Sequence, residues 1–143
     1  MSDIKKFMYE SLHLAFKSYI NDEVPVGAVV VQNGKIIGKG YNKTEKDKNI
    51  LRHAEIIAID EACKKLNSWR LCECTIFVTL EPCLMCSGAI LHSRISKIVY
   101  GATNHNFGST KYIGDNIEII GGILEDECSC LLSNFFKSKR YKK

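Results

Sequence analysis

The feature that most constrains this chain is the segment Thr79–Cys86, which reads T-L-E-P-C-L-M-C and places two cysteines three positions apart. Proline is favoured in the first turn of a helix, where its missing N–H would be unpaired anyway, so Pro82 predicts a helix start here. Cys83 and Cys86 would then lie on one side of that turn. The positive end of the helix dipole favours thiolates, the form of cysteine that binds metal ions.

A second short segment, His53-Ala54-Glu55, lies thirty positions before Cys83. His53 and Glu55 are separated by roughly 200° of helical rotation, so they can serve one site together only from the tip of a helix. We therefore predict two helices whose N-termini meet at one zinc ion per chain. His53, Cys83 and Cys86 would be its protein ligands, with the fourth position open to water. Glu55 would be the catalytic residue that transfers protons.

The other cysteines leave a structural alternative open. A catalytic zinc site has three protein ligands, whereas a structural site is closed by four, and Cys72, Cys74 or another cysteine could complete that shell. The chain has seven cysteines, and an odd count with a metal-ligand spacing argues against a disulfide framework. We expect a cytoplasmic protein, because cysteines stay reduced in that compartment.

Length and composition predict one soluble domain over residues 1–143. The chain is 45% hydrophobic and 25% charged, values that are typical of globular proteins. We expect no signal peptide, because no apolar run follows a basic start. We also expect no membrane span, because no apolar stretch approaches the roughly 20 residues that one needs.

Hydrophobic periodicity predicts a three-layer α/β domain around a mixed five-stranded sheet. Helices are expected over residues 3–20, 53–66, 83–92 and 123–137. Strands are expected over residues 24–32, 35–41, 74–80, 96–101 and 117–120, with Asn33-Gly34 as a hairpin turn. The segments 42–52 and 102–116 are expected to be loops without a helical period.

The predicted helix over residues 83–92 is apolar nearly all round. Its apolar side chains are Leu84, Met85, Ala89, Ile90 and Leu91. Such a helix is buried on every side, by the core of its own chain or by a second subunit. We therefore expect a homodimer that is joined near this helix.

Positive charge is concentrated at the end of the chain. Residues 137–143 carry +5 without an acidic residue, and the whole chain carries +4, so the preceding residues sum to −1. Basic side chains beside aromatic ones suit nucleic acid, because cations contact phosphates and rings stack on unpaired bases. The residues concerned are Phe135, Phe136, Lys137, Lys139, Arg140, Lys142 and Lys143. The alternative is a solvated basic tail that follows phenylalanines of the core.

These segments together resemble the tRNA-specific adenosine deaminases of bacteria, within the cytidine-deaminase-like superfamily, over nearly the whole chain. The H-x-E and P-C-x-x-C patterns belong to zinc nucleobase deaminases in general. Closer to the tRNA enzymes are E-P-C-L-M-C-S-G-A-I-L-H-S-R-I at 81–95 and L-L-S-N-F-F with basic residues at 131–140. E-V-P-V-G-A-V-V-V at 23–31 and H-A-E-I at 53–56 complete the similarity.

The resemblance implies a homodimer that converts the wobble adenosine of a tRNA anticodon to inosine and releases ammonia. It implies that His53, Cys83 and Cys86 bind zinc and that Glu55 transfers protons. These are the same residues that the motif spacing indicates. It implies that the flipped nucleotide contacts Asn42, Val26 and Ala54. It also implies that the last helix holds the anticodon loop through Phe135, Phe136, Lys137, Lys139 and Arg140.

One segment departs from the family pattern. The stretch 102–116 is shorter than its counterpart and lacks the expected helical pattern, and in the family this region borders the substrate. A deaminase of free nucleobases or nucleosides, such as cytosine, guanine or adenine, is therefore the runner-up function. A catalytically inactive zinc-bearing RNA-binding module is a third alternative. The intact Glu55 argues against it, because binding alone needs no carboxylate beside the metal.

Overall fold

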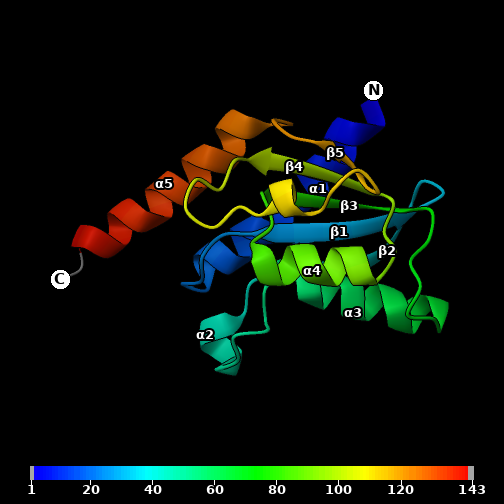
Figure 1. Ribbon diagram of the computed structural model, residues 1–143. Coiled ribbons are helices and arrows are strands. Elements are labelled where there is room, and N and C mark those ends of the chain that lie inside the picture. The colour runs from blue at the N-terminus through cyan, green and yellow to red at the C-terminus, as the bar shows by residue number, and fades with distance from the viewer. Residues whose placement is uncertain (1, 142–143) are drawn as a thin grey trace.

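The chain forms three layers, with a five-stranded sheet between two sets of helices (Figure 1). The structure is a computed structural model that describes residues 2–141. The strands are β1 Gly27–Gln32, β2 Lys35–Tyr41, β3 Cys74–Leu80, β4 Lys97–Ala102 and β5 Glu118–Ile120. The helices are α1 Ser2–Ile20, α2 Thr44–Asp47, α3 Ala54–Leu66, α4 Leu84–His92 and α5 Glu125–Tyr141, with a 3₁₀ turn η1 at Thr110–Tyr112.

The sheet is mixed and has the spatial order β2-β1-β3-β4-β5. β1 pairs antiparallel with β2 and β3, whereas β3, β4 and β5 run parallel. Asn33 and Gly34 both have positive φ, 51° and 76°, as a tight hairpin turn between twisted strands requires. The predicted fold class is confirmed, although β1 begins at Gly27 and not at Val24.

Alternating side chains of the central strands separate into two hydrophobic cores. One contains Val30, Ile76 and Ile98 beneath α3 and α4, and the other contains Val29, Phe77 and Val99 beneath α1 and α5. α3 lies close to the sheet because β2 presents Gly40 there. A Cβ atom at Gly40 would collide with the carbonyl oxygen of Ala54. This close approach places the start of α3, and with it His53, against the sheet edge.

Two segments that were predicted to be loops contain short helices. The segment 42–52 includes α2, and the segment 102–116 includes η1. α2 begins beside Glu23, whose buried carboxylate accepts two of its backbone N–H groups. Glu81 accepts backbone N–H groups of the segment that contains η1. Both predictions were wrong because the stabilising partner lies more than twenty positions away in sequence.

The last helix is longer than predicted. α5 begins at Glu125 and continues to Tyr141, so the predicted tail from residue 137 is helical as far as the structure describes it. The Nζ atom of Lys139 lies 2.6 Å from Oδ2 of Asp22, just after α1, and 5.6 Å from the ring centre of Phe135. These contacts hold the end of α5 against the end of α1. Lys142 and Lys143 lie outside the described residues, as does the side chain of Arg140.

The surface of α4 differs from the expectation for the single chain. Cys86, Ser87 and Ile90 are buried, but Leu84 in the first turn is 66% exposed. The core of one chain therefore does not cover this helix on every side, and burial of Leu84 by a second subunit stays a prediction. Of the helices in residues 2–141, none combines the length and apolar character needed to cross a membrane.

Candidate metal centre and active-site pocket

His53 and Cys83 occupy equivalent places at the starts of two helices. His53 is the N-cap residue of α3 and Cys83 that of α4, both with extended backbone conformation. Pro82 therefore precedes the N-cap and does not lie in the first helical turn as predicted. Cys86 follows in the first turn of α4, where it is fully buried. The two helix N-termini meet at one point, as the sequence spacing predicts.

The three candidate ligand atoms lie close together. Nδ1 of His53 lies 3.7 Å from Sγ of Cys83 and 3.6 Å from Sγ of Cys86, and the three atoms all lie within 4.8 Å of one another. Ordinary zinc bond lengths in a tetrahedron separate a nitrogen and a sulfur ligand by about 3.6 Å. Within residues 2–141 this is the one cluster of three or more His, Cys, Asp or Glu side chains suited to a metal. The donor set and its spacing therefore fit zinc.

The other cysteines do not complete a closed structural site. Cys72 and Cys74 lie at the start of β3, whereas the metal-binding cluster follows the end of this strand. Seven residues of strand separate the two ends by roughly 20 Å. In the described part of the chain the cluster contains three ligands. This leaves one coordination position open, as in catalytic zinc sites.

Glu55 lies in the first turn of α3 and is only 4% exposed. Burial raises the pKa of its carboxyl to about 7, although a hydrogen bond from its own backbone acts in the opposite direction. A carboxyl group whose pKa is close to neutral pH can both accept and donate a proton during turnover. Glu55 lines the same cavity as His53 and Cys83. Its position and its proton affinity therefore suit general acid–base chemistry.

The two thiols differ in proton affinity. The pKa of Cys83 is lowered to about 4, chiefly by a hydrogen bond from Cys86 and also by His53, although burial acts in the opposite direction. The same hydrogen bond, together with burial, raises the pKa of Cys86. The pKa of His53 is raised, chiefly by its hydrogen bond with Cys83. Cys83 is thus a thiolate at neutral pH, and metal binding would release the proton of Cys86.

A cavity of about 830 Å³ adjoins the metal-binding cluster. Its walls come from the chain after α1, the segment around α2, the ends of β3 and β4, and the end of α5. Four of the predicted substrate contacts line it, namely Val26, Asn42, Phe135 and Lys139. The structure therefore brings segments from most of the chain to one pocket beside Glu55.

The other predicted contacts have different positions. Ala54 is fully buried, and its backbone N–H donates to Oδ1 of Asn42 at 2.8 Å. Phe136 is 48% exposed and packs edge-on against Phe135, with ring centres 5.4 Å apart. Lys137 is exposed on α5. The predicted contact of Arg140 lies outside the described side chains, although its backbone is part of α5.

Two buried acidic residues are among the pocket residues that received no role from the sequence alone. Glu23 and Glu81 both line the cavity, and they are 3% and 8% exposed. Acidic residues are rarely buried unless their oxygens are paired. The only sequence signal was that each glutamate lies next to a predicted strand. That position does not distinguish a buried, hydrogen-bonded carboxylate from an ordinary solvated turn residue.

Comparison with known proteins agrees with this site. The family model for the "Cytidine and deoxycytidylate deaminase zinc-binding region" matches residues 1–102. A tRNA-specific adenosine deaminase of Bacillus subtilis (strain 168) is 41% identical, over 100% of this chain and 94% of its own length. The same enzyme of Rickettsia bellii (strain RML369-C) is 44% identical, over 93% of this chain and 99% of its own.

A solved structure has the same fold. It comes from a study of A-to-I editing by tRNA:A34 deaminases at the wobble position of transfer RNA, and it has a TM-score of 0.85 with 34% identity. The alignment covers 89% of this chain and 99% of that one. The chain therefore belongs to the family of the tRNA-specific adenosine deaminases, and its metal-binding segment is the zinc-binding region of the cytidine and deoxycytidylate deaminases.

Proposed function

We propose that this protein hydrolytically deaminates adenosine to inosine at the wobble position of a tRNA anticodon, as one deaminase domain over residues 1–143. The observation that carries the proposal is the full-length similarity to tRNA-specific adenosine deaminases. The pocket supports it, because Glu55 adjoins a His-Cys-Cys cluster that fits zinc. We assign one zinc ion to each chain, held by His53, Cys83 and Cys86.

The chemistry follows from the residues at the cluster. Zinc, when bound, supplies Lewis acidity that makes water a nucleophile near neutral pH. Glu55 takes one water proton as the water oxygen bonds to C6 of adenine, and it delivers that proton to N1 of the ring. The remaining O–H proton passes through Glu55 to the amino group. The C6–N bond then breaks, so adenosine and water become inosine and ammonia.

Asn42 is the proposed polar contact for the flipped nucleotide, beside Val26 in the same wall. Because Oδ1 of Asn42 accepts the N–H of Ala54, the amide N–H groups are the donors that it offers to a substrate. Ala54 would contribute through this hydrogen bond. The anticodon loop is already single-stranded, so extruding its base costs little.

The end of α5 is the proposed support for the anticodon loop. Phe135 is buried against Tyr19, with ring centres 6.0 Å apart, so it acts as a core residue. Phe136 is the half-exposed ring that can stack on an unpaired base. Lys137, Lys139 and Arg140 would contact phosphates. Of these, Lys139 lines the pocket and is held by Asp22.

A homodimer is part of this proposal. Leu84 is 66% exposed in the first turn of α4, and Tyr112 of η1 is 68% exposed. η1 packs against α4, so the two elements that carry these side chains are neighbours in the fold. A second subunit that covered this part of the surface would bury both side chains. Sedimentation of the protein, compared with a Leu84→Glu variant, tests this: a monomer at micromolar concentration in both would contradict it.

We also infer a cytoplasmic location. All seven cysteines are free, as a reducing compartment requires.

The direct test is deamination of matched substrates. The purified protein is incubated with a tRNA that carries a wobble adenosine, and separately with adenosine, adenine, guanine and cytosine. We expect the protein to produce ammonia and inosine from the tRNA and from none of the other substrates. Strong turnover of a free base without turnover of tRNA would instead identify a free-base deaminase. Zinc-loaded protein that binds tRNA but deaminates none of these substrates would identify an RNA-binding module.

A further inference from the structure

Two buried carboxylates hold two segments that form walls of the pocket, the segment 42–52 around α2 and the segment 104–110. We propose that Glu23 and Glu81 are positioning residues for the deamination reaction, each fixing one wall through backbone N–H groups. The effect on substrate rests on the proposed function, whereas the effect on the walls can be measured without any substrate.

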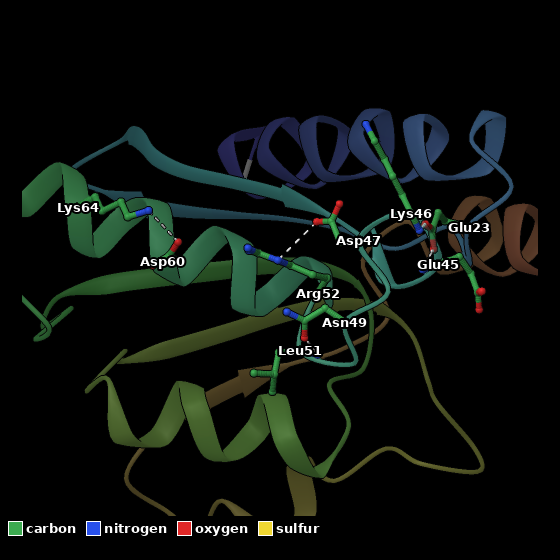
Figure 2. A network of polar contacts seen from close by, with 9 residues as sticks. All are labelled: Glu23, Glu45, Lys46, Asp47, Asn49, Leu51, Arg52, Asp60 and Lys64. Carbon is green, nitrogen blue, oxygen red and sulfur yellow. Dashed lines mark hydrogen bonds and ion pairs between the residues drawn. The ribbon is translucent and has the colours of Figure 1, made fainter.

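Glu23 replaces a missing helix cap. Its Oε1 accepts the N–H of Glu45 at 3.1 Å, and its Oε2 accepts the N–H of Lys46 at 2.8 Å (Figure 2). These N–H groups lie in the first turn of α2, where they have no partner within the helix. The N-cap residue Lys43 makes no side-chain cap hydrogen bond. A carboxylate from a distant segment therefore does what an N-cap side chain usually does.

The rest of the α2 segment is held elsewhere. Nε of Arg52 lies 3.5 Å from Oδ2 of Asp47, at the other end of α2 (Figure 2). This ion pair joins two parts of the same segment and does not tie it to the sheet. Asn42, two residues before α2, is hydrogen-bonded to Val26, Ser18 and Ala54, whereas the first turn of α2 itself is joined to the pocket edge by Glu23.

Glu81 holds a second wall of the pocket in the same way. Its Oε1 accepts the N–H of Asn104 at 3.2 Å, and its Oε2 accepts the N–H of Thr110 at 3.3 Å. The hydroxyl of Thr110 also donates to Oε2, at 2.5 Å. Gly108 lies in the turn between them, and a Cβ atom there would overlap this carboxylate. The segment 104–110 therefore wraps closely around the side chain of Glu81.

The two carboxylates lie at one edge of the sheet. β1 and β3 are antiparallel neighbours, with Ala28 opposite Val78, so the start of β1 and the end of β3 lie side by side. Glu23 shortly precedes the first of these strands and Glu81 directly follows the second. Both side chains line the cavity that contains Glu55. Charge-assisted hydrogen bonds to backbone are strong and directional, so this pair can set the shape of the pocket.

The test uses isosteric variants. Glu23→Gln and Glu81→Gln each replace an accepting oxygen with an N–H₂ group that faces a backbone donor. Glu73→Gln is the matched control, because Glu73 is exposed at the other end of β3. Thr110→Val removes the hydroxyl donor alone and Thr110→Ser retains it, which gives a milder pair if Glu81→Gln folds poorly.

Hydrogen–deuterium exchange reports on the walls directly. We expect the amides of residues 45 and 46 to exchange about ten- to a hundredfold faster in Glu23→Gln, and those of 104 and 110 in Glu81→Gln. Each change should stay within its own wall, with zinc content unchanged. Unchanged exchange in the targeted wall, or accelerated exchange throughout the chain with loss of zinc, would overturn the proposal.

Kinetics report on positioning. We expect kcat/KM for tRNA to fall at least about tenfold in both glutamine variants. Thr110→Val should lower kcat/KM to a smaller extent. Thr110→Ser and Glu73→Gln should have the same kcat/KM as the parent. Parent-like kcat/KM in both glutamine variants would overturn the positioning role. Absence of tRNA turnover in the parent protein would overturn the proposed function alone, because the exchange result would still decide whether the two glutamates hold the walls.

Discussion

The side-chain Oδ1 of Asn42 accepts the backbone N–H of Ala54 at 2.8 Å, which ties the end of β2 to the first turn of α3. Ala54 lies between His53 and Glu55, so this hydrogen bond orients both the candidate metal ligand and the candidate proton donor. An N–H group in the first turn has no partner within its helix, and His53 provides no side-chain cap. Asn42 therefore supports the start of α3 in addition to its proposed contact with substrate.

Two substitutions at Asn42 separate these roles. Asn42→Ala leaves a buried N–H unpaired and should lower the free energy of unfolding by about 1–3 kcal/mol. Asn42→Asp keeps an acceptor oxygen and should retain most of that stability, but it loses the amide donor. We expect both variants to raise KM for tRNA. Urea unfolding and steady-state kinetics measure the two effects, and an alanine variant as stable as the parent would contradict the support role.

Metal analysis tests the ligand set. We expect about one zinc ion per chain, which Cys83→Ala and Cys86→Ala should both lose, because two ligands rarely hold zinc in competition with water. Cys72→Ala is the control, since this cysteine is exposed and lies away from the cluster. Loss of zinc from the Cys72 variant would mean that the site is closed by a fourth protein ligand.

Replacing the proposed proton carrier should stop turnover without removing the metal. Glu55→Gln keeps the size of the side chain but cannot shuttle protons, and general acid–base catalysis is typically worth about 10²–10⁴ in rate. We therefore expect a loss of at least that size in kcat on tRNA, with parent-like zinc content. Single-turnover assays with metal analysis provide the measurement. Near-normal rates would remove Glu55 from the mechanism.

Glu55 should also make stability depend on pH. The carboxyl of the unfolded chain ionises near its ordinary pKa of 4.5, whereas that of the folded chain ionises at about 7. The folded protein therefore holds the extra proton between these values, and the contribution of Glu55 to stability is lost as the pH rises through 7. Glu55→Gln has no such loss.

With zinc chelated, Glu55→Gln should gain stability over the parent as the pH rises from 5 to 8. The gain should reach at most about 3 kcal/mol, since one pKa unit corresponds to about 1.4 kcal/mol. Chelation matters because a cation beside the carboxylate would lower its pKa. Urea unfolding at several pH values measures this. A constant difference between the two proteins would contradict the raised pKa.

Salt dependence tests the end of α5 as a phosphate contact. Replacing Lys137, Lys139 and Arg140 by alanine should weaken tRNA binding and reduce the slope of log K against log salt. Each lost contact to a single-stranded phosphate should change that slope by about 0.7. Lys35→Ala in the β1–β2 hairpin, at the other end of the sheet, should leave the slope unchanged. Equal slopes for the triple variant and the parent would exclude phosphate contacts by these residues.

The sequence by itself determined the fold class and the chemistry of the candidate site. Period-two and helical hydrophobic patterns are local, so the strands and the long helices followed from residue order. The candidate metal cluster could also be predicted from the sequence, because the P-C-x-x-C and H-x-E motifs can contribute to one metal site only from the N-termini of two helices. Two predicted boundaries were wrong: Pro82 lies before the cap of α4, and β1 begins three residues later than Val24.

Only the tertiary structure decided how the pocket is walled. α2 and η1 depend on carboxylates that are 22 to 29 positions away in sequence, so their own composition reads as loop. The extended part of α5 is joined to the end of α1 by the ion pair between Lys139 and Asp22, which are 117 positions apart. Phe135 and Phe136 are identical side chains next to each other, and packing against Tyr19 buries only the first. Such assignments require the distances between remote segments, because the physical partner of each residue lies outside any local window.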